Sequence, residues 1–247
     1  MGSCVVVTRA LSDAALALFV APLCAACREP LASPTLGAVC ERCWSSIDSF
    51  VPPCCVRCGA ALPSWRVVSL SEASCARCRR TPPLVSAAAA IGPYQGTLQA
   101  ILQALKYDSR TSLARPLARR MRASARGILQ SADAVVPVPL HRSRERTRGF
   151  NQARELARHL GVPVLDALVR SRATRSQADL PAARRHANVR GAFALHRRAN
   201  VRGLTLVLVD DVSTTGATLN ACARPLLDAG AAEVRAVTAA KTLAGSR

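Results

Sequence analysis

Four Cys-x-x-Cys pairs in the first third of the chain set the strongest limit on what this sequence can fold into. The pairs are Cys24 with Cys27, Cys40 with Cys43, Cys55 with Cys58, and Cys75 with Cys78. Two such pairs complete a tetrahedral shell of thiolates around one Zn²⁺, and a shell closed in this way leaves no position for a substrate. We therefore expect two structural zinc ions. Pairs that are neighbours in sequence are the natural partners, although the spacing also allows an interleaved arrangement.

A disulfide framework is the alternative use of so many cysteines. Disulfide frameworks suit small secreted domains, but the longest apolar run near the start, residues 14–23, follows Asp13 and no cluster of Lys or Arg, unlike an export signal. The run is also shorter than the roughly 20 apolar residues of a membrane helix. We therefore expect a cytoplasmic protein without a membrane span, in which Cys4, Cys54 and Cys222 are not metal ligands.

Positive charge is concentrated in one part of the chain. Lys and Arg number 34 against 15 for Asp and Glu, which gives a formal net charge of +19. Residues 106–202 hold 22 of these cations and 6 of the acids, a net charge of +16. Such a field favours a surface that meets polyanions. A solvated basic face is the alternative, because charge alone names no ligand.

The sequence divides after the last Cys pair, at a charged break with two prolines at residues 79–83. We expect an N-terminal helix and double zinc ribbon over residues 1–82 and an α/β domain over residues 83–247. Apolar, β-branched runs predict strands, and amphipathic segments between them predict helices, which together favour a parallel sheet with helices on both faces. The expected strands are 86–91, 134–140, 204–209 and 234–241, and the expected helices are 95–107, 112–126, 151–160 and 218–229.

The loop Asp210-Asp-Val-Ser-Thr-Thr-Gly-Ala-Thr218 follows the strand expected at 204–209. Ligands of open α/β sheets bind just beyond the carboxyl ends of strands. Backbone N–H groups and hydroxyls at the start of a helix would hold a phosphate, and two adjacent carboxylates suit ribose hydroxyls or a hydrated Mg²⁺. A plain turn with Asp and Thr caps is the alternative, but it does not need both acids and the Thr-Thr-Gly-Ala-Thr run.

This loop resembles the phosphoribosyl pyrophosphate (PRPP) loop of type I phosphoribosyltransferases. Several other segments resemble the ComF family of competence-associated proteins, as does the double zinc ribbon. They are Leu-Lys-Tyr at 105–107, Pro-Val-Pro-Leu at 137–140, Arg-Gly-Phe-Asn-Gln at 148–152, Thr174 with Gln177, and Asn-Val-Arg-Gly-Ala-Phe at 188–193. The match covers nearly the whole chain. One departure is Ser109, where the family pattern has Gly.

The resemblance implies roles for individual residues. Asp210 and Asp211 would contact the ribose hydroxyls, directly or through Mg²⁺, as the catalytic carboxylates. The PRPP-binding residues would be Thr214, Thr215, Gly216, Ala217 and Thr218 around the 5′-phosphate, with Lys106, Arg148 and Asn151 at the pyrophosphate end or the mouth of the cleft. For Arg148 the alternative is a surface cation, and for Asn151 it is helix capping.

The resemblance also implies an association with DNA uptake and its machinery, and two functions fit it. As an enzyme, the protein would transfer phosphoribosyl from PRPP to an acceptor, with Mg²⁺ neutralising the leaving group. As a non-catalytic accessory protein, it would bind single-stranded DNA through the basic stretch, with PRPP as a regulator or vestigial ligand. The arginines expected at the DNA lie in two loops: Arg142, Arg144, Arg146 and Arg148, and Arg184 and Arg185.

Overall fold

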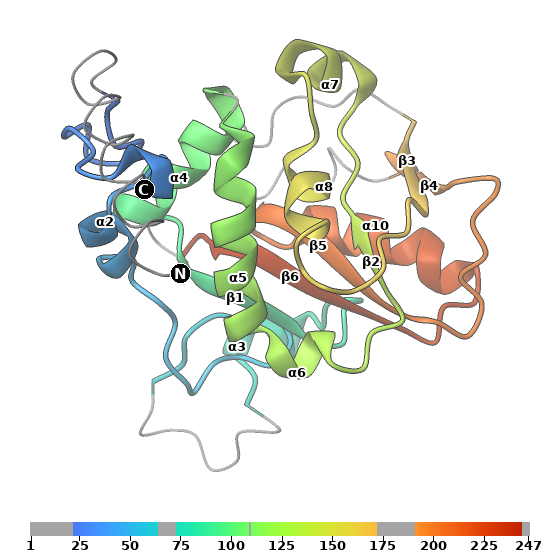
Figure 1. Cartoon of the computed structure of the whole chain (residues 1–247). Helices are drawn as coiled ribbons and strands as arrows, with labels where there is room; N and C mark the ends of the chain where they lie inside the picture. Colours follow the sequence, from blue (N-terminus) through green and yellow to red (C-terminus); the bar gives the residue numbers. More distant parts are fainter. Residues whose placement is uncertain (1–21, 64–72, 109, 172–190, 244–247) are drawn as a thin grey trace, which may run out of the picture.

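The computed structural model describes residues 22–63, 73–108, 110–171 and 191–243 (Figure 1). Several expectations lie outside these ranges and stay predictions. They concern the N-terminal helix, Cys4, Ser109, Thr174, Gln177, Arg184, Arg185 and the first three residues of the 188–193 segment.

Four parallel strands form the central sheet in the order β1-β6-β5-β2. The strands are β1 (Ala88–Pro93), β6 (Glu233–Lys241), β5 (Thr205–Ser213) and β2 (Ala134–Pro137). Leu206 in β5 lies opposite Ala134 in β2 and Val234 in β6, which fixes the register of the middle of the sheet. The prediction of an α/β domain with a parallel sheet is confirmed.

Alternate residues of β5 enter two different hydrophobic cores. Val207 and Val209 pack with buried side chains such as Leu117 of α5 (Ala114–Ser124). Leu206 and Leu208 pack on the opposite face of the sheet. Because both faces are covered, β5 is apolar without interruption from Leu206 to Val209, as expected for a central parallel strand.

Helices cover both faces of the sheet, and α5 crosses one face (Figure 1). The same side carries α4 (Gly96–Tyr107), α6 (Arg126–Leu129) and α8 (Gln152–Ala157). The other side carries α10 (Ala217–Asp228), next to a hairpin of β3 (Leu168–Arg170) and β4 (Phe193–Leu195). The remaining helices are η1 (Pro34–Leu36), α2 (Glu41–Ser45), α3 (Ala76–Arg80), η3 (Thr111–Leu113) and α7 (Arg142–Arg148). In the described ranges, no helix is both long and apolar enough to cross a membrane.

The structure differs from the sequence prediction in two places near the carboxyl ends of the strands. Residues 142–148 form helix α7, where we expected a loop, because His141 caps the first turn through Ser143 and Gly149 ends the helix at φ 78°. Strand β5 continues to Ser213, where we expected it to end at Val209. The two carboxylates therefore stand on a strand and not in a loop.

The Cys-rich segment covers the outer edge of β1. The backbone N–H of Phe50 donates to the carbonyl of Ile91 at 2.8 Å, and the N–H of Ala88 donates to the carbonyl of Val56 at 2.9 Å. These bonds pair an edge that would otherwise expose free backbone groups. Side chains of the segment, Leu31 and Ile47 among them, join the same core as α4 and α5. The division of the chain after residue 82 stays a prediction.

A glycine marks the closest approach between the Cys-rich segment and the sheet. A Cβ on Gly92 would lie 1.9 Å from the carbonyl oxygen of Asp48, so the two backbones touch where Gly92 has no side chain. We expect Gly92→Ala to lower the free energy of unfolding by about 1–3 kcal/mol or more, because the backbones must separate. Thermal and urea unfolding would measure this change.

The matched control is Gly127→Ala, because a Cβ on Gly127, in α6, meets no atom within 4 Å. This control should leave stability unchanged or raise it by up to about 1 kcal/mol. Equal stabilities of the two variants would contradict the close approach.

Candidate active site and metal centres

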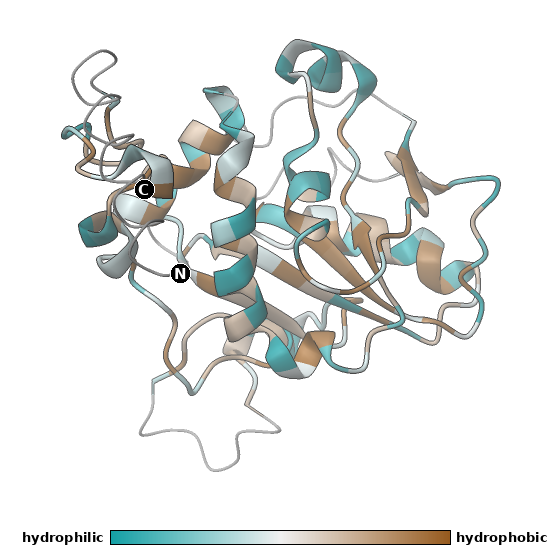
Figure 2. Ribbon diagram, in the orientation of Figure 1, coloured by the Kyte–Doolittle hydropathy of each residue, from teal (hydrophilic) through white to brown (hydrophobic). Residues whose placement is uncertain are grey.

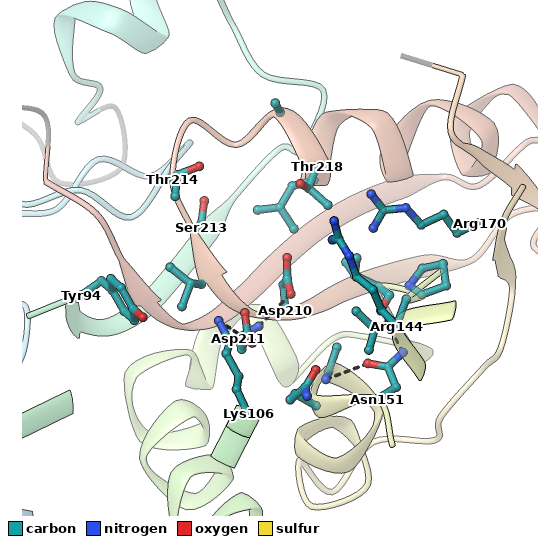
Figure 3. Close-up of a pocket in the computed structure, with 18 of the residues that line it drawn as sticks. Tyr94, Lys106, Arg144, Asn151, Arg170, Asp210, Asp211, Ser213, Thr214 and Thr218 are labelled. Carbon is teal, nitrogen blue, oxygen red and sulfur yellow. Dashed lines mark hydrogen bonds and ion pairs between the residues drawn. The ribbon is translucent and has the colours of Figure 1, made fainter. Parts of the chain in front are cut away.

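A cavity of about 390 Å³ lies at the carboxyl ends of β5 and β2 (Figure 3). Its wall includes nine of the ten residues expected at the phosphoribosyl site: Lys106, Arg148, Asn151, Asp210, Asp211, Thr214, Gly216, Ala217 and Thr218. These residues come from α4, from the α7–α8 region and from the β5–α10 turn. The fold thus gathers side chains that are more than one hundred positions apart in the sequence.

The turn from β5 into α10 forms one end of this cavity. Gly216 starts the helix at φ 77°, a left-handed conformation that favours glycine. The first turn of α10 faces this end of the cavity, so the positive end of its helix dipole lies where an anion would be held. Thr215 lies outside the cavity wall: its hydroxyl accepts from the N–H of Ala217, and its carbonyl accepts from the guanidinium of Arg77 in α3.

The two adjacent carboxylates point to opposite faces of the sheet because they are consecutive on a strand. Asp211 forms an ion pair with Lys106 of α4, with 2.9 Å between Nζ and Oδ2. Asp210 lies on the side of Arg170 and Cys222, and the charges of these three groups affect one another. Figure 3 shows Lys106 beneath Asp211. It also shows Asp210 turned toward Thr218 and toward the guanidinium groups of Arg144 and Arg170.

Burial changes the ionisation of this group of residues. Burial and the neighbouring Asp211 raise the pKa of Asp210 from 3.8 to about 7. Burial works against the charge of Lys106, but the Asp211 carboxylate outweighs it and raises the Lys106 pKa. Lys106 is therefore charged at neutral pH, while Asp210 is close to the midpoint of its titration.

The opposite wall comes from α7 and α8. Asn151 caps α8, since its Oδ1 accepts from the N–H groups of Ala153 and Arg154, and its Nδ2 donates to the carbonyl of Val138. The hydrogen bonds at Oδ1 of Asn151 are thus those of a helix cap, and its side chain also borders the cavity. Arg148 donates to Oε1 of Gln152 at 3.1 Å, and its guanidinium lies over the ring of Tyr107.

Neither Tyr94 nor Arg170 was expected at this site from the sequence, and Arg144 was expected only at the DNA. All three line the cavity. Tyr94 comes directly after β1, so its place at the carboxyl end of a strand was a usable signal. Arg170 ends β3, where its guanidinium packs on the ring of Phe193. No sequence motif indicates that Arg170 lines the cavity, because it is placed there by the pairing of β3 with β4, two strands far apart in the sequence.

The eight cysteines of the Cys-x-x-Cys pairs form two clusters. The sulfur atoms of each cluster lie within 4.8 Å of one another, and the clusters combine pairs that are neighbours in sequence. The members are Cys24, Cys27, Cys40 and Cys43 in the first cluster, and Cys55, Cys58, Cys75 and Cys78 in the second. The sequential pairing is therefore the one that the structure adopts.

The geometry of both clusters fits a tetrahedral ion. The Sγ atoms of Cys27 and Cys40 are 3.9 Å apart, near the roughly 3.8 Å that a Zn–S bond of about 2.3 Å requires. Burial opposes ionisation of the Cys24 thiol, but backbone N–H groups of Cys27, Cys40 and Ala26 lower its pKa to about 6. The ten cysteines in the described ranges are all free of disulfides. Burial raises the pKa of Cys43 and of Cys78, so full deprotonation of either cluster would depend on the bound metal. Each cluster offers four sulfur atoms to one metal ion.

Comparison with known proteins identifies the chain. Residues 117–246 match the family model of the phosphoribosyl transferase domain. The DNA utilization protein YhgH of Salmonella typhimurium is 36% identical over 92% of this chain and 100% of its own length. Competence protein F of Haemophilus influenzae is 33% identical over 80% of this chain and 87% of its own. The chain belongs to the ComF family.

Membership of the ComF family confirms the resemblance read from the sequence, and the phosphoribosyl transferase match confirms the fold class. The solved structure of the allosteric regulatory enzyme of purine biosynthesis is 24% identical over 56% of this ComF chain and 30% of its own chain, with a TM-score of 0.37. The family match spans β5, the β5–α10 turn and α10, which carry most of the cavity residues.

The two clusters predict a metal content of two ions per chain. Cys24→Ser and Cys55→Ser should each reduce this content by one ion, because three thiolates hold a tetrahedral ion poorly. Cys54→Ser is the matched control, since Cys54 is adjacent to Cys55 but belongs to neither cluster. Elemental analysis of the purified variants would measure the metal. Loss of metal from Cys54→Ser, or full metal in both cluster variants, would contradict this assignment.

The raised pKa of Asp210 predicts a pH-dependent stability. Between about pH 4 and 7 the folded protein keeps a proton on Asp210 that the unfolded chain releases, so stability falls as pH rises through this window. Asp210→Asn should remove this loss. The difference in unfolding free energy between this variant and the parent protein should therefore grow in favour of the variant by up to about 1.4 kcal/mol per pH unit between about pH 4 and 7. Above about pH 7 this difference should stay constant.

Urea unfolding at pH 4.5, 6 and 8 would test this prediction, because titrations common to both proteins cancel in the difference. Asp228→Asn, at the exposed end of α10, is the control for loss of a carboxyl group. An advantage of Asp210→Asn that does not change with pH would show that Asp210 is ionised throughout.

Proposed function

We propose that this ComF-family protein binds PRPP with Mg²⁺ in the cavity described above, and that both cysteine clusters hold structural Zn²⁺. The observation that carries the proposal is the juxtaposition of a helix N-terminus with two carboxylates at the end of β5. A phosphate cradle and a ribose-binding pair of acids within one cavity fit a sugar phosphate. Cysteines without disulfides persist in reducing compartments, which supports a cytoplasmic location.

In the proposed complex, the start of α10 holds the 5′-phosphate through its N–H groups and the hydroxyls of Thr214 and Thr218. Asp210 and Asp211 accept from the ribose hydroxyls or hold Mg²⁺, which would neutralise the charge of the pyrophosphate. Lys106 is tied to Asp211, so it fixes this carboxylate and adds a cation beside the ribose. Arg144, Arg148 and Arg170 supply further positive charge to the pyrophosphate end.

This arrangement supports transfer of the phosphoribosyl group. A nucleophile attacks C1 of the ribose, the bond from C1 to the pyrophosphate oxygen breaks, and pyrophosphate leaves with the bonding electrons. The protein contributes positioning and electrostatic stabilisation of the leaving group, because none of the residues needs to form a covalent bond.

A role in DNA handling is the second candidate, in which PRPP is a regulator or a vestigial ligand. Helix α7 places Arg144 and Arg148 on the cavity wall, and its Arg142 and Arg146 are exposed beside them. Relatives of this chain are named for DNA utilization and competence. A basic helix at the mouth of the cavity would let single-stranded DNA and PRPP influence each other's binding.

Calorimetric titration with PRPP in the presence of Mg²⁺ tests the proposed site. We expect binding to the protein and a loss of about a hundredfold or more in Asp210→Asn/Asp211→Asn, because two charged contacts disappear. Asp228→Asn should bind like the parent protein. Pyrophosphate release during a screen of nucleobases and amines then tests transfer.

Three outcomes separate the candidates. If the parent protein binds PRPP, the double variant does not, and pyrophosphate is released with some acceptor, the result supports the enzyme function. Binding without release by any acceptor supports the regulatory role of PRPP. No binding, or equal binding by the double variant, would refute the phosphoribosyl site and leave DNA as the candidate ligand.

A further inference from the structure

A stripe of arginines runs along α5 and into α6. Arg115, Arg119 and Arg122 follow one another at intervals of four and three residues in α5, so they share one face of the helix. Arg126 begins α6 and continues the series. All four side chains are exposed. Figure 2 shows hydrophilic, teal turns along α5 and at the start of α6.

The last three arginines of the stripe border a cavity of about 590 Å³. Its wall is apolar where α6 and the turn after α8 meet, and the residues there are Leu129, Leu160, Val162 and Pro163. The guanidinium of Arg122 reaches across to this turn, since a Cβ on Gly161 would lie 3.3 Å from its Cζ. The cavity therefore combines a cationic rim with an apolar floor.

Within the described ranges, none of these four arginines takes part in an ion pair. The ion pairs found in the described ranges belong to Arg28, Lys106, Arg154, Arg158 and Arg235. Asp133, which follows Ala132 of this cavity wall, accepts from the N–H of Thr205, so its carboxylate is already engaged. Four exposed guanidinium groups along one face make a positive surface, and such a surface attracts polyanions.

We propose that the α5 stripe, defined as Arg115, Arg119, Arg122 and Arg126, binds the backbone of single-stranded nucleic acid. The arginines would contact successive phosphates along the helix, since guanidinium groups match phosphate oxygens in pairs. An unpaired base would lie against the apolar floor and the flat face of a guanidinium. A duplex keeps its bases stacked inside, so the floor favours a single strand.

The stripe is separate from the candidate active site. The cavity lies against Ala132, just before β2 begins, and so at the amino ends of the strands, whereas Asp210 stands at their carboxyl ends. The proposal rests on the DNA-handling role suggested above and extends it to a second surface. A strand bound along α5 would not compete with PRPP, in contrast to one bound across α7.

The test is the salt dependence of binding to a fluorescent oligothymidine, measured by anisotropy. Arg119→Glu/Arg122→Glu should weaken binding by about tenfold, and Arg119→Gln/Arg122→Gln should reduce the slope of log K against log salt by about 1.4. The matched control is Arg197→Glu/Arg198→Glu, which makes the same change of charge at two exposed arginines after β4. A PRPP titration of each variant reports on folding and on the active-site cavity.

Loss of oligothymidine affinity in the α5 variants, with the control unchanged and a weaker affinity for a duplex of equal length, supports the proposal. Equal losses in the control would overturn it, because net charge alone would then explain binding. A loss confined to Arg142→Glu/Arg146→Glu in α7 would also overturn it, while the DNA-handling role would stand. Equal affinity for the duplex would refute the single-strand assignment.

Discussion

The parallel pairing of β5 between β2 and β6 is the constraint on which the rest of the structure depends. Because β5 is hydrogen-bonded on both sides and covered on both faces, its direction and register are fixed by many contacts at once. The same strand continues past its apolar part into Asp210 and Asp211. Strand alternation then sends one carboxylate to Lys106 and the other toward Arg170. The alternation of side chains along β5 therefore decides which charged residue each carboxylate meets in the cavity.

The cysteine clusters act at the edge of this sheet. Backbone bonds from the Cys-rich segment cover β1, and Gly92 allows the closest contact. The second cluster also reaches the β5–α10 turn, since Arg77 of α3 donates to the carbonyl of Thr215. The segment gains stability from its contacts with the sheet, and metal bound in its clusters would add to this stability. The segment also covers a strand edge that could otherwise pair with another chain.

Positive charge in the region 106–202 lies on more than one surface of the molecule. Lys106 and Arg170 lie in the cavity beside the carboxylates. The exposed arginines of α5 stand apart from them, around a separate cavity at the other end of the strands. A net charge counted along the sequence cannot separate these groups, because helices α5 and α7 send neighbouring arginines to different surfaces. Only their distribution in space assigns the two groups to two separate cavities.

Features that depend on a local pattern could be predicted from the sequence. Each Cys-x-x-Cys pair, the apolar run of β5 and the turn at Gly216 is a short segment, so cysteine clusters, a parallel sheet and the turn that starts α10 were predictable. Tertiary structure decided which cysteine pairs combine, that Lys106 meets Asp211, and that Arg170 enters the cavity. These contacts join residues that are far apart in the chain. The sequence around Lys106 or Arg170 does not distinguish them from the many other cations, so only the fold shows which cations are buried beside the carboxylates.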